Sequence, residues 1–164
     1  MANTKSAQKR SRQSLKRASA NKVIKSNVEE MFEQISDRYG VVNKIISVPN
    51  HPKNDEEIVS LYESQITSKT KLIMVCHMIN ITGQILPIKK ICEMAHGYGV
   101  EVMVDGAHCV GHFDFSIDDF NCDYYGSSLH KWLATPLGAG LLYVNKNKTH
   151  RTVSYTHLTL PTKA

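Results

Sequence analysis

Long apolar runs are missing from this sequence of 164 residues. No stretch of about 18 or more apolar residues occurs, so no segment has the length and hydropathy of a transmembrane helix. The basic N-terminus is not followed by an apolar segment, which argues against a secretory signal. The sequence therefore predicts a soluble, cytoplasmic protein with no membrane partner.

Cysteine is also scarce, and the four cysteines are far apart in the sequence. Zinc sites typically use cysteines separated by about two to four residues, so no metal site is expected. Most of the cysteines lie in apolar runs, where a reduced thiol behaves as a small hydrophobic side chain. We therefore expect buried, reduced thiols at Cys76, Cys92, Cys109 and Cys122.

Acidic residues are absent from the first 25 residues, which hold eight of the 20 basic residues. All 15 acidic residues lie in the remaining chain. This asymmetry indicates that two pieces of different composition have been joined. A basic arm binds phosphate backbones without reading their sequence. Residues 1–25 are therefore interpreted either as an arm that binds RNA nonspecifically or as a disordered basic tail.

The two ends of the chain resemble sequences that are unrelated to the middle of the chain. About 22 N-terminal residues resemble the start of bacterial small-subunit ribosomal protein twenty, through Met1-Ala2-Asn3, Lys5-Ser6-Ala7, Lys9-Arg10, Arg12-Gln13-Ser14 and Lys16-Arg17. This resemblance implies the alternative function, an rRNA-binding ribosomal protein fragment that acts through the basic N-terminus. The last 12 residues, VSYTHLTLPTKA, resemble translated sequencing adapters and have no apolar period. We therefore expect a basic segment at 1–24, a folded domain at 25–152 and a non-native-looking tail at 153–164.

The middle of the chain alternates between helix and strand patterns. Helices are predicted over Val28–Tyr39, ended by Gly40, over Asp55–Ile66, capped by Asn54, and from Pro87 to about Gly97–Gly99. Strands are predicted over Val41–Val48, Leu72–Cys76, Val100–Val104, Asp123–Gly126 and Gly140–Asn145. The unbroken apolar run of Leu72–Cys76 predicts a strand buried on both faces. This alternation predicts an α/β fold with a mostly parallel sheet and helices on its faces.

Polar clusters directly follow, or soon follow, three of these strands. They are His77–Gly83, Asp105–His108 and Ser128–Lys131. Open α/β sheets bind ligands at the carboxyl ends of their strands. The sequence therefore predicts a ligand site made from these three clusters.

The residue types in the clusters suit pyridoxal 5'-phosphate. This cofactor needs a lysine amine for a Schiff base, a carboxylate at its ring nitrogen, and donors for its phosphate. Asp105 would stay ionised against a pyridinium, and Lys131 would need partial burial to free its amine. Each residue also has an ordinary interpretation, such as a turn aspartate, a solvated lysine or a histidine satisfied near a turn.

The order of these segments and their amino-acid sequences resemble those of the aminotransferase class V family. This fold-type-I group of pyridoxal-phosphate enzymes includes cysteine desulfurases and isopenicillin-N-epimerase-like proteins. The resemblance lies in HMINITGQILPIKKIC, VEVMVDGAHCVGHF and CDYYGSSLHKWLATPLGAGLLYV. It implies part of the family's large domain, an amino-acid substrate and a homodimer for the full-length family.

The resemblance also implies roles for individual residues. Lys131 would form the Schiff base and Asp105 would pair with the pyridine nitrogen. The remaining cofactor contacts would be Asn80 and His108 at the 3-hydroxyl, and Ser128 and His130 at the phosphate. Cysteine desulfurases commonly have glutamine where this sequence has His108, which favours the epimerase-like branch.

Several parts of the family pattern are missing from this sequence. They are the phosphate loop, the residue that stacks on the cofactor ring, the small domain with its carboxylate-binding arginine, and the cysteine of the desulfurase mobile loop. We therefore expect an incomplete enzyme with little or no activity, acting through Lys131 if it acts at all. An α/β domain whose site has decayed and which acts only through its surface is a third possibility. Substrate and reaction type stay open.

Overall fold

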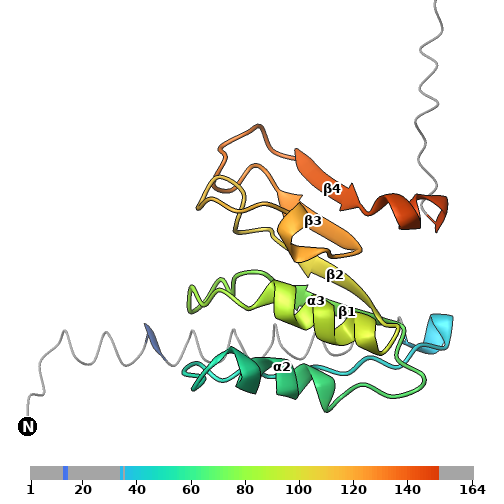
Figure 1. Ribbon diagram of the computed structural model, residues 1–164. Coiled ribbons are helices and arrows are strands. Elements are labelled where there is room, and N and C mark those ends of the chain that lie inside the picture. The colour runs from blue at the N-terminus through green and yellow to red at the C-terminus, as the bar shows by residue number, and fades with distance from the viewer. Residues whose placement is uncertain (1–12, 15–33, 35, 152–164) are drawn as a thin grey trace, which may run out of the picture. The chain divides into compact units, whose positions relative to one another are not determined.

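The computed structural model describes residues 13–14, 34 and 36–151 (Figure 1). The chain divides into two compact units, Met1–Ile45 and Ile46–Ala164. Residues 13 and 14 are helical, but the rest of the predicted basic segment 1–24 lies outside the described residues, as does the tail 153–164. RNA binding by residues 1–25 stays a prediction.

The first unit contains the end of the predicted helix over Val28–Tyr39. Residues 34 and 36–39 are helical, and Gly40 follows with a φ of 64°. The Val41 N–H donates to the Ser36 carbonyl at 3.1 Å, which is the hydrogen bond of a helix end closed by a left-handed glycine. The predicted helix stop is therefore confirmed, while residues 28–33 lie outside the described residues.

The second unit is built on a four-stranded sheet whose strands follow one another in chain order (Figure 1). They are β1 (Leu72–Cys76), β2 (Glu101–Asp105), β3 (Tyr124–Ser128) and β4 (Gly140–Val144). The first three strands are parallel, and β4 is antiparallel to β3. The predicted mostly parallel sheet is confirmed, and four of the five predicted strands are present within one or two residues of their predicted bounds.

Two α-helices and two short 3-10 helices accompany the sheet. They are α2 (Asp55–Glu63), α3 (Ile88–Gly97), η1 (Asp118–Phe120) and η2 (Lys146–Arg151). The Asn54 side chain accepts a hydrogen bond from the Glu57 N–H at 2.9 Å, which confirms the predicted N-cap of α2. Helix α2 ends three residues before the predicted Ile66, because Ser64 to Ile66 form tight turns.

The apolar core lies between the helices and one face of the sheet. Alternate strand residues point to this face, as the two-residue period of a strand requires. The core members are Ile58, Tyr62, Ile73, Val75, Leu86, Ile88, Ile91, Cys92, Ala95, Val100, Val102, Val104, Cys122 and Tyr125.

The opposite face of the sheet is largely open in the described part of the chain. Leu72 is 49% exposed and Met74 61% exposed, whereas Ile73 and Val75 between them are buried. The prediction that β1 is buried on both faces is therefore wrong. The helices that pack on the core cover only one face, so an unbroken apolar run ended up half buried.

The strand predicted over Val41–Val48 is also wrong. These residues have no strand conformation and pair with none of the four strands. Val42 is 87% exposed. A strand is stabilised by hydrogen bonds to a neighbouring strand, and an apolar pattern by itself does not supply that neighbour.

None of the four cysteines forms a disulfide bond, but they differ in burial. Cys92, Cys109 and Cys122 are buried as predicted, whereas Cys76 is exposed. Cys76 points to the open face of β1, because it alternates with the buried Val75. No helix in the described part of the chain is long and apolar enough to cross a membrane.

Candidate functional site

The three polar clusters predicted from the sequence meet at one edge of the sheet. Because β1, β2 and β3 are parallel, their carboxyl ends share that edge. The His77 N–H donates to the Asp105 carbonyl at 2.8 Å, and the Gly106 N–H donates to the Gly126 carbonyl at 2.7 Å. The predicted convergence of the clusters is therefore present.

The turn after β2 holds the Asp105 carboxylate in place. Its Oδ1 accepts a hydrogen bond from the Ala107 N–H at 2.9 Å, and Asp105 is half-buried. Gly106 is buried against the Tyr125 ring: a Cβ added at Gly106 would lie 2.0 Å from the tyrosine hydroxyl. Glycine is therefore required sterically in this turn, and the Ser127 hydroxyl donates to its carbonyl at 2.9 Å.

Lys131 and His108 form the closest pair among the predicted site residues. The Lys131 Nζ lies 2.8 Å from His108 Nε2. Burial lowers the pKa of His108 and the Lys131 charge lowers it further, whereas the Asp105 carboxylate opposes the shift. His108 therefore lies within electrostatic reach of both the amine and the carboxylate, and its neutral form is favoured. Lys131 is exposed, so the partial burial expected of it is not seen in this chain.

Two aromatic side chains that the sequence reasoning did not single out complete this cluster. The Trp132 indole N–H donates to His108 Nδ1 at 3.4 Å. The Trp132 ring stacks on His112, with centroids 4.3 Å apart and planes 22° from parallel. The signal available in the sequence was that the one tryptophan of the chain directly follows the candidate lysine.

Gly111 explains how the loop carrying His108 and His112 reaches the lysine. It has a φ of 80°, and a Cβ there would lie 2.9 Å from the Leu133 backbone nitrogen. Glycine both adopts this left-handed conformation freely and allows close backbone approach. The loop therefore packs directly on the segment 131–133.

The other three predicted residues are placed less directly. Ser128 is half-buried at the end of β3, opposite Gly140 in β4. His130 is half-buried, and its Nδ1 is buried with no hydrogen-bond partner among the described residues. Asn80 is exposed in the loop after β1, and in the described part of the chain it makes no hydrogen bond to Asp105, His108 or Lys131. The structure thus groups Asp105, His108 and Lys131. It shows no hydrogen bond between Asn80 and these three residues.

His77 is a buried histidine next to this edge. It is surrounded by the rings of Phe113, Phe115, Phe120 and Tyr125. Its Nδ1 lies 3.0 Å from the Tyr125 hydroxyl. Burial lowers the pKa of His77 to about 4, so this histidine is neutral at pH 7 and belongs to the aromatic core behind the site.

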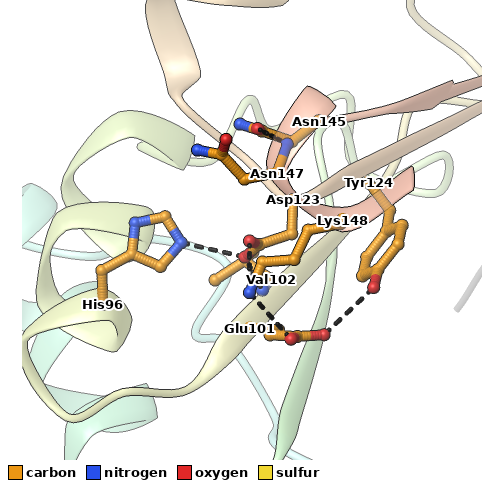
Figure 2. Close-up of polar contacts among 8 residues, drawn as sticks. All are labelled: His96, Glu101, Val102, Asp123, Tyr124, Asn145, Asn147 and Lys148. Atoms are coloured by element: carbon orange, nitrogen blue, oxygen red, sulfur yellow. Dashed lines mark hydrogen bonds and ion pairs between the residues drawn. The ribbon is translucent and has the colours of Figure 1, made fainter. Parts of the chain in front are cut away.

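A second polar network lies at the opposite, amino-terminal edge of the parallel strands (Figure 2). The buried Asp123 accepts hydrogen bonds from His96 Nε2 at 2.9 Å and from the Val102 N–H at 2.8 Å. Lys148 lies 3.5 Å from the other Asp123 oxygen and 2.8 Å from Glu101. These contacts tie α3, β2, β3 and η2 together, which gives the network a structural role.

The electrostatics of Asp123 follow from these contacts. Burial alone would raise the pKa of its carboxyl, but the hydrogen bonds from His96 and Val102 and the His96 and Lys148 charges outweigh burial and hold it below the usual value. Among the described residues, no three His, Cys, Asp or Glu side chains are grouped so that they could hold a metal ion.

Comparison with known proteins shows which family this sequence matches. The family model "Aminotransferase class-V" matches residues 25–156. Isopenicillin N epimerase of Streptomyces clavuligerus is 34% identical over 113 residues, which cover 69% of this chain and 28% of the epimerase. A cysteine desulfurase of Escherichia coli is 31% identical over 116 residues, covering 70% of this chain and 27% of that enzyme.

Solved structures give the same picture. The C-DES structure with glycine covalently linked to its pyridoxal-phosphate cofactor matches with a TM-score of 0.66 and 26% identity, over 72% of this chain and 31% of that one. The apo cysteine desulfurase of Thermococcus onnurineus matches with a TM-score of 0.60 and 25% identity, over 71% of this chain and 28% of that one. The chain thus spans between about a quarter and a third of the length of these four proteins. With its sheet, its three clusters and the matched segment in agreement, the chain belongs to the aminotransferase class V family of pyridoxal-phosphate enzymes.

Proposed function

We propose that the carboxyl edge of this sheet holds pyridoxal 5'-phosphate and serves an enzyme that acts on an amino acid. The observation that carries the proposal is the 2.8 Å contact between Lys131 Nζ and His108 Nε2, beside the strand end that presents Asp105. An amine and a nearby carboxylate are two of the groups that this cofactor requires, and here His108 contacts the amine.

Unsatisfied polar atoms support the fit of the cofactor to these residues. Four buried side-chain atoms have no hydrogen-bond partner among the described residues: His130 Nδ1, Thr135 Oγ1, and the amide nitrogen and oxygen of Gln84 in the loop after β1. Buried polar atoms are nearly always paired, so an orphaned pair close in sequence to Lys131 is expected where a bound group supplies the missing partners. A phosphate, with its acceptor oxygens, matches both a hydroxyl and an imidazole N–H.

Each residue then has a defined task. Lys131 supplies the amine for the cofactor aldehyde, and Asp105 supplies the negative charge that keeps the cofactor ring nitrogen protonated. As the family resemblance implies, His108 and Asn80 would hydrogen-bond the 3-hydroxyl, and Ser128 and His130 would bind the phosphate. Pyridoxal phosphate, when bound, supplies an electron sink that stabilises negative charge on the amino-acid carbon.

The relatives point to an amino-acid substrate. The enzymes that match are named for cysteine desulfuration and for isopenicillin N epimerisation. The proposal is therefore an amino acid or an amino-acid derivative as substrate, and a homodimer as the assembly of the active enzyme. The expectation that this chain by itself has little activity stays a prediction.

Reductive trapping tests the proposal directly. Purified chain is mixed with a small excess of pyridoxal 5'-phosphate, reduced with borohydride and digested, and the labelled lysine is identified by mass spectrometry. We expect the label at Lys131 and its loss in Lys131→Ala. The matched control Lys89→Ala removes an exposed lysine of α3 and should label like the wild type.

A separate variant tests the role of Asp105. Asp105→Asn keeps the shape of the side chain but removes the charge, and hydrogen bonds to charged groups are worth about 1.5–3 kcal/mol. We expect labelling of Lys131 to need about tenfold or more cofactor in this variant. Equal labelling of many surface lysines in wild type and Lys131→Ala would show that the proposed site does not exist.

A further inference from the structure

The connection between β3 and β4 folds back onto the end of β3. The Leu129 N–H donates to the Ala139 carbonyl at 3.1 Å, and the Thr135 backbone nitrogen lies 3.4 Å from the Leu129 carbonyl oxygen. That carbonyl belongs to the peptide bond that joins Leu129 to His130. Thr135 therefore lies beside the stretch from Ser128 to His130, which contains both residues proposed to bind the phosphate.

The Thr135 hydroxyl is enclosed but unpaired. Its Oγ1 is shielded from solvent and has no hydrogen-bond partner among the described residues, although Ala134 and Pro136 on either side are exposed. A hydroxyl can donate one hydrogen bond and accept two, and buried polar atoms in folded proteins are nearly always paired. A bound group that carries hydrogen-bond acceptors would satisfy this hydroxyl.

The backbone around Thr135 is strained. Ala134 has a φ of 55°, a left-handed conformation that is uncommon for residues other than glycine. Strain of this kind persists where the surrounding structure enforces it, and it clusters in segments that hold ligands. On the other side, Pro136 restricts the residue before it to an extended backbone. The turn thus fixes the backbone of Thr135 without any ligand.

The unpaired atoms near the end of β3 suit an anion with several oxygens. His130 Nδ1 is also buried without a partner, and an imidazole can supply an N–H there, as Thr135 can supply an O–H. A phosphate group has three strong acceptor oxygens, so it can accept from both donors at once. Gln84 also has unpaired amide atoms, but among the described residues no hydrogen bond joins it to residues 128–135.

We propose that Thr135 is a third phosphate-binding residue, whose hydroxyl donates to a cofactor phosphate oxygen beside Ser128 and His130. The inference rests on the proposed function, because that function puts the phosphate at Ser128 and His130. The family resemblance implied those two residues and not Thr135. The connection between β3 and β4 then selects pyridoxal 5'-phosphate over pyridoxal, although the phosphate loop of the family is missing from this sequence.

The first test is the stability of the unliganded chain. Thr135→Val removes the hydroxyl and keeps the shape of the side chain. Because the hydroxyl has no partner in the described part of the chain, we expect the urea midpoint of this variant to equal or exceed that of the wild type. Thr149→Val is the matched control: it removes an exposed hydroxyl that donates to the Lys146 carbonyl at 2.9 Å, and it should leave cofactor labelling unchanged.

The second test measures phosphate recognition as the aldehyde concentration that labels half of Lys131 after borohydride reduction. Pyridoxal 5'-phosphate and pyridoxal are compared, because they differ only in the phosphate. A hydrogen bond to a charged group corresponds to about a tenfold or larger change in affinity. Thr135→Val should therefore need about tenfold or more pyridoxal 5'-phosphate, but the same concentration of pyridoxal. Thr135→Ser, which keeps a hydroxyl, should match the wild type with both aldehydes.

The outcomes separate this inference from the proposed function. An unchanged requirement for pyridoxal 5'-phosphate in Thr135→Val overturns the inference, and so does an equal rise for pyridoxal, which indicates a distorted site. A Thr135→Ser chain that binds as weakly as Thr135→Val also overturns it. So does a Thr135→Val chain that unfolds at lower urea than the wild type or does not fold, because the hydroxyl would then serve the protein itself. Wild type in which neither aldehyde prefers Lys131 over the other lysines would instead reject the proposed function.

Discussion

The buried imidazole of His77 shares a 3.0 Å hydrogen bond with the Tyr125 hydroxyl. Both side chains lie in the core directly behind the strand ends that form the candidate site. The same Tyr125 ring packs against Gly106, so one tyrosine supports the Asp105 turn and satisfies a histidine that has no access to water. Several properties of the protein depend on this arrangement.

We predict that His77 makes the protein acid-sensitive. Burial lowers its pKa from 6.5 to about 4, so between these values the unfolded chain binds a proton that the folded chain does not. Stability is therefore full above pH 6.5 and falls as the pH drops toward 4, by up to about 3 kcal/mol. Urea unfolding at several pH values measures this slope.

The control for this prediction is the exposed His51. His77→Gln should flatten the slope between pH 6.5 and 4, although it also weakens the core, whereas His51→Gln should keep it. An unchanged slope in His77→Gln would assign the acid sensitivity to other groups.

We predict that Gly106→Ala is strongly destabilising. The added methyl group would lie 2.0 Å from the Tyr125 hydroxyl, and overpacking of a core costs about 1–3 kcal/mol or more. Gly97→Ala is the matched control, because a Cβ at this last residue of α3 meets nothing within 4 Å. Alanine is favoured over glycine in a helix by about 1 kcal/mol, so the control should be neutral or slightly stabilising. Thermal melts of the two variants give the comparison.

We predict that Asp123→Asn lowers the free energy of unfolding of the second unit. It removes the charge that accepts from His96 and Val102, at a cost of about 1–3 kcal/mol near pH 7. Because its contacts hold the Asp123 pKa below the usual value, this contribution is present above about pH 4 and is lost as the pH falls through the folded-state pKa. The wild type and the variant should therefore converge in acid, while Asp114→Asn, at an exposed position, should match the wild type throughout. Stability curves that stay parallel down to acid pH would contradict the argument.

We predict that one thiol reacts faster than the other three in the native protein. Burial raises the pKa of Cys92 to about 12 and those of Cys109 and Cys122 to about 11, and all three are inaccessible. Burial and the Asp105 charge raise the pKa of Cys76 as well, but Cys76 is the exposed cysteine. Iodoacetamide should therefore modify Cys76 first, and Cys76→Ser should remove the fastest phase seen by mass spectrometry.

Cofactor binding should slow this reaction. Cys76 is paired with Asp105 across β1 and β2, and paired residues of neighbouring strands point to the same face. A cofactor ring against Asp105 therefore covers the thiol. Unchanged labelling at saturating pyridoxal phosphate would place the cofactor elsewhere.

Local sequence patterns were sufficient for most of the secondary structure. Strand β1 has its predicted bounds, because its apolar run is closed by polar residues at both ends, and Asn54 caps α2 as its side-chain chemistry predicts. The carboxyl-edge position of Asp105 followed from the parallel order of the strands. These features depend on residues that are close in the sequence or on general rules of topology.

The errors arose where the outcome depends on a distant partner. The apolar pattern of Val41–Val48 required a neighbouring strand, and the run of β1 required cover on both faces. The contacts of His108 with Lys131 and Trp132 join residues more than 20 positions apart, and no local pattern encodes them. The roles of the site residues stay predictions until they are measured.

The antiparallel direction of β4 has a kinetic consequence. Ser128 and Gly140 close a hairpin around the segment that carries Lys131, and the Leu129 N–H donates to the Ala139 carbonyl at its base. Hairpins form within microseconds, whereas parallel pairs such as β2 with β3 must first close a long loop. The lysine therefore lies between two strands that are closer in sequence than β2 and β3 are, and we expect the aspartate to reach it only when the parallel pairing of β2 with β3 is complete.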